Sequence, residues 1–76
     1  VEEIIGVLRE LHEDISVPRN IKVRLLNTID ILGEARDLSS KKNKALNELE
    51  EVIDDANLEA YSRTRLYTII SLLETV

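Results

Sequence analysis

Cysteine is absent from this chain of 76 residues, proline occurs once and glycine twice. Without cysteine there is neither a disulfide bond nor a thiolate metal site. Apolar packing alone therefore has to stabilise a small domain that buries only about 60% of its unfolded surface. The lack of cysteine fits a reducing, cytoplasmic setting. The scarcity of proline and glycine favours helix along almost the whole chain.

Long apolar runs and aromatic side chains are also scarce. No apolar run approaches the roughly 18 residues that would span a bilayer, so we expect no membrane segment. Tyr61 and Tyr67 are the only aromatic residues, and the formal net charge is −5. An acidic chain with few aromatic residues is a poor match to a nucleic-acid-binding protein. The chain begins at Val1 without an initiator methionine, so we expect the natural protein to carry a few residues before it.

Apolar residues recur at helical spacing in four segments, and no segment shows the strict alternation of a strand. The spacing predicts helices near residues 1–14, 17–34, 41–55 and 58–75. The four apolar stripes are Ile4, Leu8, Leu11 and Ile15; Ile21, Leu25, Thr28, Ile29 and Leu32; Leu46, Leu49, Val52, Ile53 and Ala56; and Leu66, Ile69, Ile70 and Leu73.

Cap residues mark the breaks between these segments. Ser16 and Asn57 are expected to cap the second and fourth helices, because their side-chain oxygens can accept from free amides of the next turn. Pro18 and Glu59 would then lie in the first turns of those helices, where a missing amide is tolerated and a carboxylate is favoured by the helix dipole.

The central connection is expected between Gly33 and Ser40. Gly33 is a candidate helix end, and Asp37, Ser39 or Ser40 is a candidate cap for the third helix. The second helix could instead continue through Leu38, because a glycine inside a helix costs only about 1 kcal/mol.

The chain resembles itself at an offset of 41 residues, which places Leu8 on Leu49 and Arg24 on Arg65. The repeat predicts one all-α domain over residues 1–76, made of helical hairpins at about 1–34 and 41–76. We expect a closed four-helix up-and-down bundle of two duplicated hairpins with pseudo-twofold symmetry, in which four stripes share one core. An open solenoid generally needs about three repeats, so it applies only if copies associate end to end.

The stretch from Glu13 to Arg24, EDISVPRNIKVR, follows an amphipathic helix that opens near VEEIIGVLREL. This pattern resembles a small archaeal family of unassigned function, Uncharacterised Protein Family 0147. The resemblance covers nearly the whole chain and is most specific at VPRNI, although the family has proline where this chain has Glu59. It implies an archaeal, soluble, four-helix protein with no catalytic residue to carry over.

Catalytic and metal-binding chemistry have little support in the sequence. His12 is the only histidine, and a di-iron bundle needs Glu-x-x-His pairs on two helices. Arg9 stands where that glutamate would be, and Ile53 is the repeat partner of His12. We therefore expect His12 to be an ordinary residue at the edge of the core or on the surface, and we expect no cofactor, no metal and no small-molecule substrate. An enzyme is the third and least supported interpretation, because neither a nucleophile with its base nor a phosphate-binding glycine loop is present.

Acidic residues gather at the ends of the first and third predicted helices, where they oppose the helix dipoles and call for positive partners. The simplest arrangement pairs Asp14 with Arg24 and Asp55 with Arg65 as structural ion pairs. A divalent-cation or basic-peptide site is the alternative, although no calcium-binding loop motif is present. The acidic residues are Glu10, Glu13 and Asp14, then Glu50, Glu51, Asp54 and Asp55; the basic residues that face them are Arg19, Lys22, Arg24, Arg63 and Arg65.

Basic residues also gather around the central connection, at Arg36, Lys41, Lys42 and Lys44. They raise the alternative of an RNA- or ribosome-associated factor that uses the connection around Lys41–Lys44. The acidic balance of the whole chain opposes this interpretation.

Apolar residues that lie off the main stripes of the second and fourth helices favour protein binding. One stripe per helix is enough to fill a four-helix core, so further apolar residues either widen the buried face or form a surface for a partner. We therefore predict a non-catalytic helical module that binds another protein or itself. The candidate partner-binding residues are Val23, Leu26, Ile31, Tyr67 and Leu72.

Overall fold

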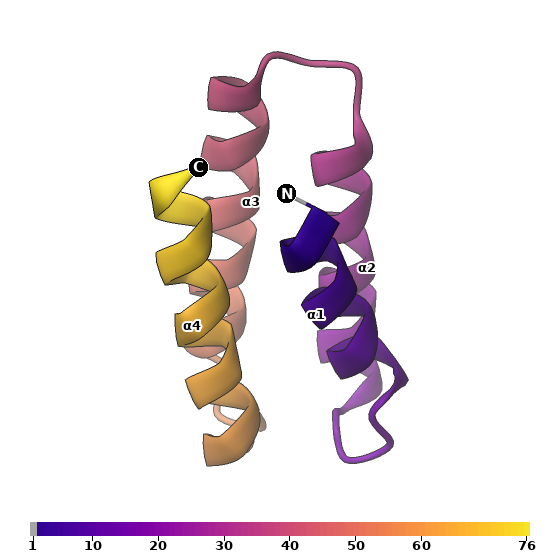
Figure 1. The fold of residues 1–76 in the computed structure, drawn as a ribbon. Coiled ribbons are helices and arrows are strands. Elements are labelled where there is room, and N and C mark those ends of the chain that lie inside the picture. Colours follow the sequence, from indigo (N-terminus) through magenta and orange to yellow (C-terminus); the bar gives the residue numbers. More distant parts are fainter. Residues whose placement is uncertain (1) are drawn as a thin grey trace.

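The computed structural model describes residues 2–76. This part of the chain contains four α-helices and no strand. The helices are α1 (Glu2–Glu13), α2 (Arg19–Gly33), α3 (Leu38–Ile53) and α4 (Ala60–Thr75). The α1–α2 and α3–α4 loops lie at one end and the α2–α3 connection lies at the other, so the helices run up and down (Figure 1). The four predicted helices are confirmed; Val1, the first residue of the predicted first helix, lies outside the described residues.

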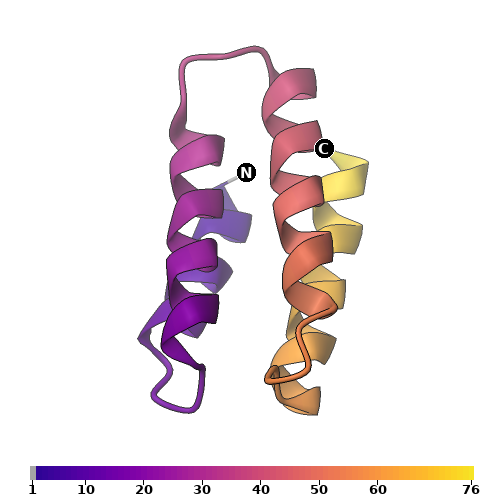
Figure 2. The same ribbon diagram turned by 180° about the vertical axis from the view of Figure 1, so that it is seen from behind.

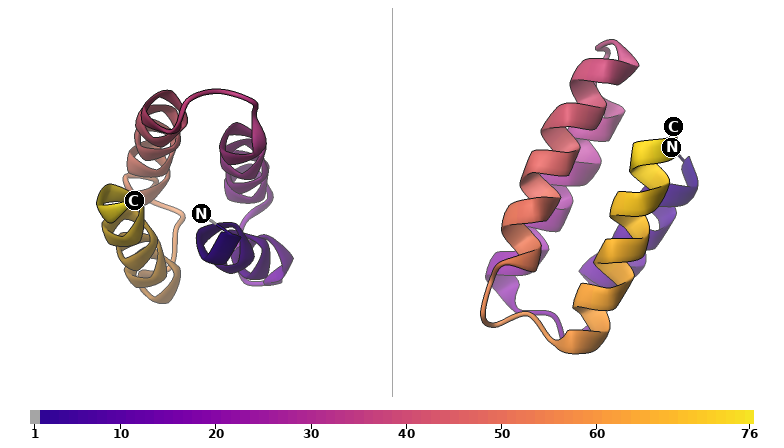
Figure 3. Two further views of the ribbon diagram at one scale, coloured as in Figure 1. Left: turned by 45° about the horizontal axis from the view of Figure 1, so that its top comes forward. Right: turned by 90° about the vertical axis from the view of Figure 1, so that its left-hand side faces the viewer.

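The helices form a closed ring. Each helix packs against its neighbours in the chain, and α1 also packs against α4. From behind, α2 and α3 lie side by side (Figure 2), and the view with the top tilted forward shows the four helices around one axis (Figure 3). Within residues 2–76, α1 does not pack on α3, nor α2 on α4. The radius of gyration of 11.4 Å matches the value of about 11 Å expected for a compact domain of this length. The predicted four-helix bundle is confirmed.

One apolar stripe from each helix fills the core, together with Val17 and Leu58 from the two hairpin loops. The buried Thr28 hydroxyl donates to the backbone carbonyl of Arg24 at 3.0 Å, so its polar group is satisfied. The core consists of Ile4, Leu8, Leu11, Val17, Ile21, Leu25, Ile29, Leu32, Ala45, Leu49, Val52, Leu58, Leu66, Ile69, Ile70 and Leu73.

The predicted stripes are wrong at the ends of α1 and α3. Ile15 is 96% exposed because α1 ends at Glu13, so helical spacing no longer applies to it. Ala56 is exposed for the same reason, since α3 ends at Ile53. Ala45, which was not predicted, is fully buried, whereas Leu46 is only half-buried against the core.

The predicted caps of α2 and α4 are also wrong. Helix α2 begins after Pro18 and α4 after Glu59, and neither residue makes a side-chain cap hydrogen bond. Ser16 lies too far back to cap α2, and its N–H donates instead to Oδ1 of Asp14 at 2.9 Å. Pro18 is therefore the N-cap residue itself, with an extended backbone (φ −59°, ψ 151°) rather than a first-turn residue.

The start of α3 confirms one of the three candidate caps. Oδ2 of Asp37 accepts from the backbone N–H of Ser40 at 3.2 Å, so α3 begins at Leu38, three residues before its predicted start. Helix α2 ends at Gly33, as one of the two alternatives predicted. The connection is thus only residues 34–37.

The two hairpin loops repeat each other's local geometry at the 41-residue offset. Asp14 N–H donates to Leu11 O at 3.2 Å, and Asp55 N–H donates to Val52 O at 3.1 Å. Pro18 and Glu59 have nearly the same backbone angles. The turn geometry therefore recurs, while an overall twofold relation between duplicated hairpins remains a prediction.

Candidate interaction surfaces

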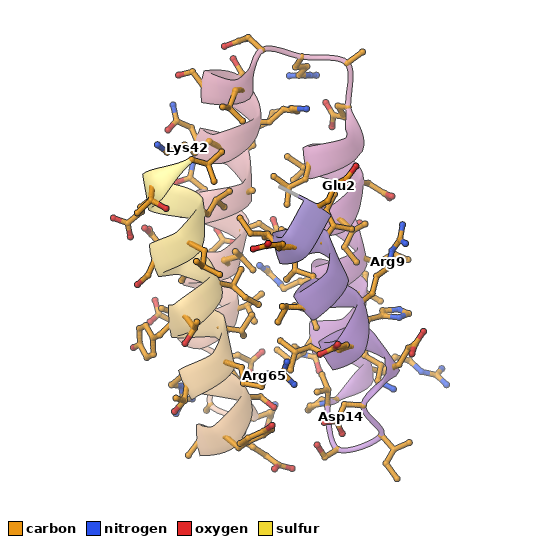
Figure 4. All side chains as sticks on the ribbon, in the orientation of Figure 1. Glu2, Arg9, Asp14, Lys42 and Arg65 are labelled. Carbon is orange, nitrogen blue, oxygen red and sulfur yellow. The ribbon has the colours of Figure 1, made fainter. Side chains whose placement is uncertain are left out.

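Two sets of ion pairs join the α1–α2 hairpin to the α3–α4 hairpin. Nη1 of Arg24 lies 2.7 Å from Oε2 of Glu51 and 3.3 Å from Oε1 of Glu48, across the seam between α2 and α3. Nη2 of Arg65 lies 3.0 Å from Oε2 of Glu10, across the seam between α4 and α1 (Figure 4). Each arginine therefore crosses to a helix of the other hairpin.

The predicted pairs of Asp14 with Arg24 and of Asp55 with Arg65 are absent from the ion pairs within residues 2–76. Both aspartates accept hydrogen bonds inside their loops instead, and Oδ2 of Asp55 also accepts from Nδ2 of Asn20, in the other hairpin, at 3.1 Å. Asp14 accepts from the N–H and the hydroxyl of Ser16, and Asp55 accepts from the N–H of Asn57 at 2.8 Å. The arginines lie on helix sides that face another hairpin, which is why they meet glutamates rather than their loop aspartates.

These contacts shift the affinity of several groups for protons. The hydrogen bond to Glu51 raises the pKa of Arg24, and the hydrogen bond to Glu10 raises the pKa of Arg65. Hydrogen bonds from the backbone and side chain of Ser16 hold the pKa of Asp14 below its ordinary value. All three groups are therefore held in their charged forms at neutral pH.

The candidate residues Ile31 and Leu72 belong to the seams between the hairpins. Each lies seven residues, or about two helical turns, beyond a seam arginine and so on the same helix side. Ile31 is half-buried and packs against the core, whereas Leu72 is 40% exposed. Ile31 therefore contributes to the core, whereas Leu72 lies on the seam side of α4 with much of its surface accessible.

The other three candidates lie on the outer sides of α2 and α4. Val23 is 54% exposed, Leu26 is 46% exposed and Tyr67 is 53% exposed. Because α2 and α4 do not pack on each other, Val23 and Leu26 cannot share a patch with Tyr67. The five predicted residues are thus divided between two seams and two outer sides.

Helical spacing places charged residues on the same outer sides as these apolar residues. The sequence pattern alone did not predict that these charged residues bind a partner. We define the first outer face as Arg9, Glu13, Arg19, Lys22, Val23, Leu26 and Asp30, which is exposed four residues beyond Leu26. We define the second outer face, by the 41-residue offset, as Glu50, Asp54, Ala60, Arg63, Thr64, Tyr67 and Ser71. Arg9 extends on the α2 side of the bundle, away from α4 (Figure 4). The signal that could have identified these faces is the alignment of Arg9 with Glu50.

Arg63 has a structural role at the end of α3. Its Nε donates to the carbonyl oxygen of Ile53 at 3.0 Å, and its Nη2 donates to those of Asp55 and Leu58 at 3.1 and 3.2 Å. These carbonyl groups belong to a helix C-terminus and the loop after it, where backbone acceptors lack helical partners.

The basic connection is partly used for internal contacts. Nζ of Lys42 donates to the carbonyl oxygens of Glu74 and Val76 at 3.1 and 3.4 Å, beside the end of α4 (Figure 4). Nε of Arg36 lies 2.6 Å from Oε2 of Glu34. Two of the four basic groups therefore already have partners in the fold.

His12 is half-buried at the end of α1. Within residues 2–76 no three or more histidine, cysteine or acidic side chains are grouped so that they could hold a metal ion. The same part of the chain shows no pocket. None of its helices is long and apolar enough to cross a membrane.

Comparison with known proteins identifies relatives along the full chain. A UPF0147 protein of Thermoplasma acidophilum is 39% identical over 75 residues, which are 97% of this chain and 85% of the relative. A UPF0147 protein of Aeropyrum pernix is 36% identical over 72 residues, which are 93% of this chain and 79% of the relative.

A solved structure has the same fold. The crystal structure of MMP1188, a protein of unknown function, has a TM-score of 0.95 and 32% sequence identity, and the match covers 99% of this chain and 86% of that one. The model of an uncharacterised protein family, UPF0147, matches residues 1–76. The resemblance seen at VPRNI is therefore confirmed, and the chain belongs to the UPF0147 family, together with its archaeal relatives.

Proposed function

We propose that this chain is a non-catalytic helical module that binds another protein through the outer sides of α2 and α4. The observation that carries the proposal is the exposure of Val23, Leu26 and Tyr67 beside a core that one stripe per helix already fills. Burying such side chains would stabilise a complex by about 25 cal/mol per Å² of apolar area removed from water. Because the core is already filled, only a binding partner can bury them.

The arrangement on α2 strengthens this proposal. Val23 and Leu26 are three residues apart, so their side chains are neighbours on the helix surface. A single exposed apolar residue is ordinary on a protein surface, but adjacent ones bordered by charged groups resemble the centre and rim of an interface. Arg19 and Lys22 supply such a border on the same helix.

RNA association is the weaker alternative. It needs free cationic groups at the connection, whereas Lys42 and Arg36 contact Glu74 and Glu34. It also has to act against a net charge of −5. The proposal includes a cytoplasmic setting, in agreement with the lack of cysteine.

Affinity purification from the native cell tests the proposal. The wild-type chain and a Leu26→Ser, Tyr67→Ser variant serve as baits, with an Asn27→Ser, Thr68→Ser variant as the matched control at exposed polar positions. We expect the wild type and the control to retain the same proteins and the first variant to lose them. Equal recovery by all three baits, or recovery of RNA alone, contradicts the proposal.

A further inference from the structure

The two outer faces occupy equivalent positions but differ in charge. The first outer face carries Arg9, Arg19 and Lys22 against Glu13 and Asp30, so its formal charge is three minus two, or +1. The second outer face carries Glu50 and Asp54 against Arg63, so its formal charge is one minus two, or −1. The difference arises because Glu50 replaces Arg9 and Ala60 replaces Arg19 at the 41-residue offset, and the replacement of Asp30 by Ser71 offsets part of it.

The two faces also differ in which of their charged groups are exposed to a partner. Arg63 is fixed by three backbone carbonyl groups at the end of α3. Glu50 and Asp54 are exposed on the outer side of α3. Arg9 and Arg19 are exposed on the other hairpin. One face thus offers free cationic groups and the other offers free carboxylates.

Both faces also present an apolar side chain at the same repeat position. Leu26 of α2 corresponds to Tyr67 of α4, and each is about half exposed. An apolar centre with a charged border is the usual composition of a protein interface, and tyrosine is enriched in interface centres.

We propose that copies of this chain associate head to tail, with the first outer face of one copy docked on the second outer face of the next. This inference rests on the proposed function and names its partner, a second copy of the chain. Opposite formal charges favour the contact and guide the approach of the two faces. Contact of a face with its own counterpart would bring +1 against +1, or −1 against −1, so charge opposes a twofold dimer through either face.

The geometry has a consequence for assembly size. A contact between two different faces leaves one free face at each end, so it continues into a ring or an open chain. The α2 and α4 positions are diagonal in the bundle, and the two faces therefore lie on different sides of each copy. Stacked hairpins of this kind would extend the 41-residue repeat from one copy into the next.

Sedimentation velocity of the full chain tests the proposal. Wild type is expected to form species larger than a dimer as concentration rises, and high salt should reduce them because exposed charges are screened. Leu26→Asp blocks the first outer face and Tyr67→Asp blocks the second, so each variant alone should be a monomer. An equimolar mixture should give a one-to-one dimer and nothing larger, because each partner supplies the face that the other lacks.

A matched control and a folding check complete the experiment. Leu38→Asp places the same charge at an apolar residue of similar exposure, the first residue of α3 and outside both faces, and it should assemble as wild type does. Far-UV circular dichroism confirms that the variants are folded. If a variant unfolds, Leu26→Ser and Tyr67→Ser replace the aspartate variants in the mixture.

Three outcomes overturn the proposal. The first is a wild type that stays monomeric up to about 1 mM, the weakest affinity of interest. The second is one variant that assembles as wild type does while the other does not. The third is a mixture of the two variants that stays monomeric. A monomeric wild type that still retains proteins in the native-cell purification overturns self-association alone and leaves the proposed function standing.

Discussion

Arg65 of α4 donates to Glu10 of α1 across the seam between the first and last helices, with 3.0 Å between Nη2 and Oε2. Adding or subtracting 41 residues converts this pair into Arg24 and Glu51, which are paired across the other seam. Each hairpin therefore contributes one arginine and one glutamate to this repeated pair, and Glu48 adds a second carboxylate beside Arg24.

A double-mutant cycle measures the strength of the Arg65–Glu10 pair. We expect Glu10→Gln and Arg65→Gln to couple by about 0.5 kcal/mol or less in urea unfolding, because the Glu10 side chain is 68% exposed. The coupling should shrink at 1 M salt, where exposed charges are screened. A coupling above about 2 kcal/mol, or one insensitive to salt, would contradict the exposed geometry.

Arg24 should contribute more to stability than Arg65. It meets two carboxylates, and Glu48 is the less exposed of them, with 24% of its side chain accessible. We expect Arg24→Gln to lower the free energy of unfolding by about 1 kcal/mol. The measurement is urea unfolding of both single variants, and a larger loss for Arg65→Gln would contradict this ranking.

Val52→Ala and Val23→Ala remove the same atoms from opposite environments. Val52 is fully buried in the core, and we expect its truncation to cost about 2 kcal/mol from lost burial and a new cavity. Val23 is more than half exposed, and its truncation should change stability by no more than about 0.5 kcal/mol. Thermal or urea unfolding of the two variants checks the contrast; equal losses would place Val23 in the core.

Helical periodicity was sufficient to predict the four helices and most of the core, but it could not show where the helices stop. Ile15 continues the apolar spacing of α1, yet it is exposed. The side chain of Asp14 accepts from the backbone N–H of Ser16, and the chain leaves the helix there. The competition between a side-chain acceptor and the helical backbone decides this boundary, and helical periodicity does not show it.

The ion pairs show a second limit of the sequence. The repeat correctly marked Arg24 and Arg65 as equivalent, but it did not select their partners. Asp14 and Glu51 both lay within the acidic runs predicted to meet Arg24. Only the packing of α3 beside α2 selects Glu51 over Asp14, because it brings Oε2 of Glu51 to 2.7 Å from Nη1 of Arg24. The opposite charges of Arg9 and Glu50 are apparent in the sequence. That both residues lie on outer faces could be known only from the packing of the helices.

Asp37 links the start of α3 to pH. Hydrogen bonds from Ser40, first of all from its side chain, hold the pKa of Asp37 below its ordinary value of 3.8. Its stabilising contribution is therefore present above that pH and is lost as pH falls through the lowered pKa of the folded state. We expect Asp37→Ala to lower the urea midpoint at pH 7 and to lose this difference from wild type in strong acid.

A serine variant separates capping from charge at this position. Asp37→Ser keeps a side-chain acceptor for the cap but cannot ionise. Its advantage over Asp37→Ala should persist in acid, measured by the same urea midpoints. A gap between wild type and Asp37→Ala that widens as pH falls would show the wrong sign and contradict the role of the ionised carboxylate.

Gly6 is a residue whose replacement should stabilise the bundle. It lies inside α1, its backbone is not in the left-handed region, and an added Cβ would meet nothing within 4 Å. We expect Gly6→Ala to raise the free energy of unfolding by about 0.5–1 kcal/mol, because alanine loses less backbone entropy in a helix. A loss of stability in thermal unfolding would contradict this description of α1.

Photo-crosslinking in the native cell tests whether the outer sides of α2 and α4 bind protein. A photoreactive residue replaces Leu26, Tyr67 or Lys44 in separate variants, with Ser39 as an exposed control position. If these outer sides bind protein, we expect protein adducts at positions 26 and 67 and none at position 39. Adducts confined to RNA at position 44, with no protein adduct at positions 26 and 67, would contradict this prediction.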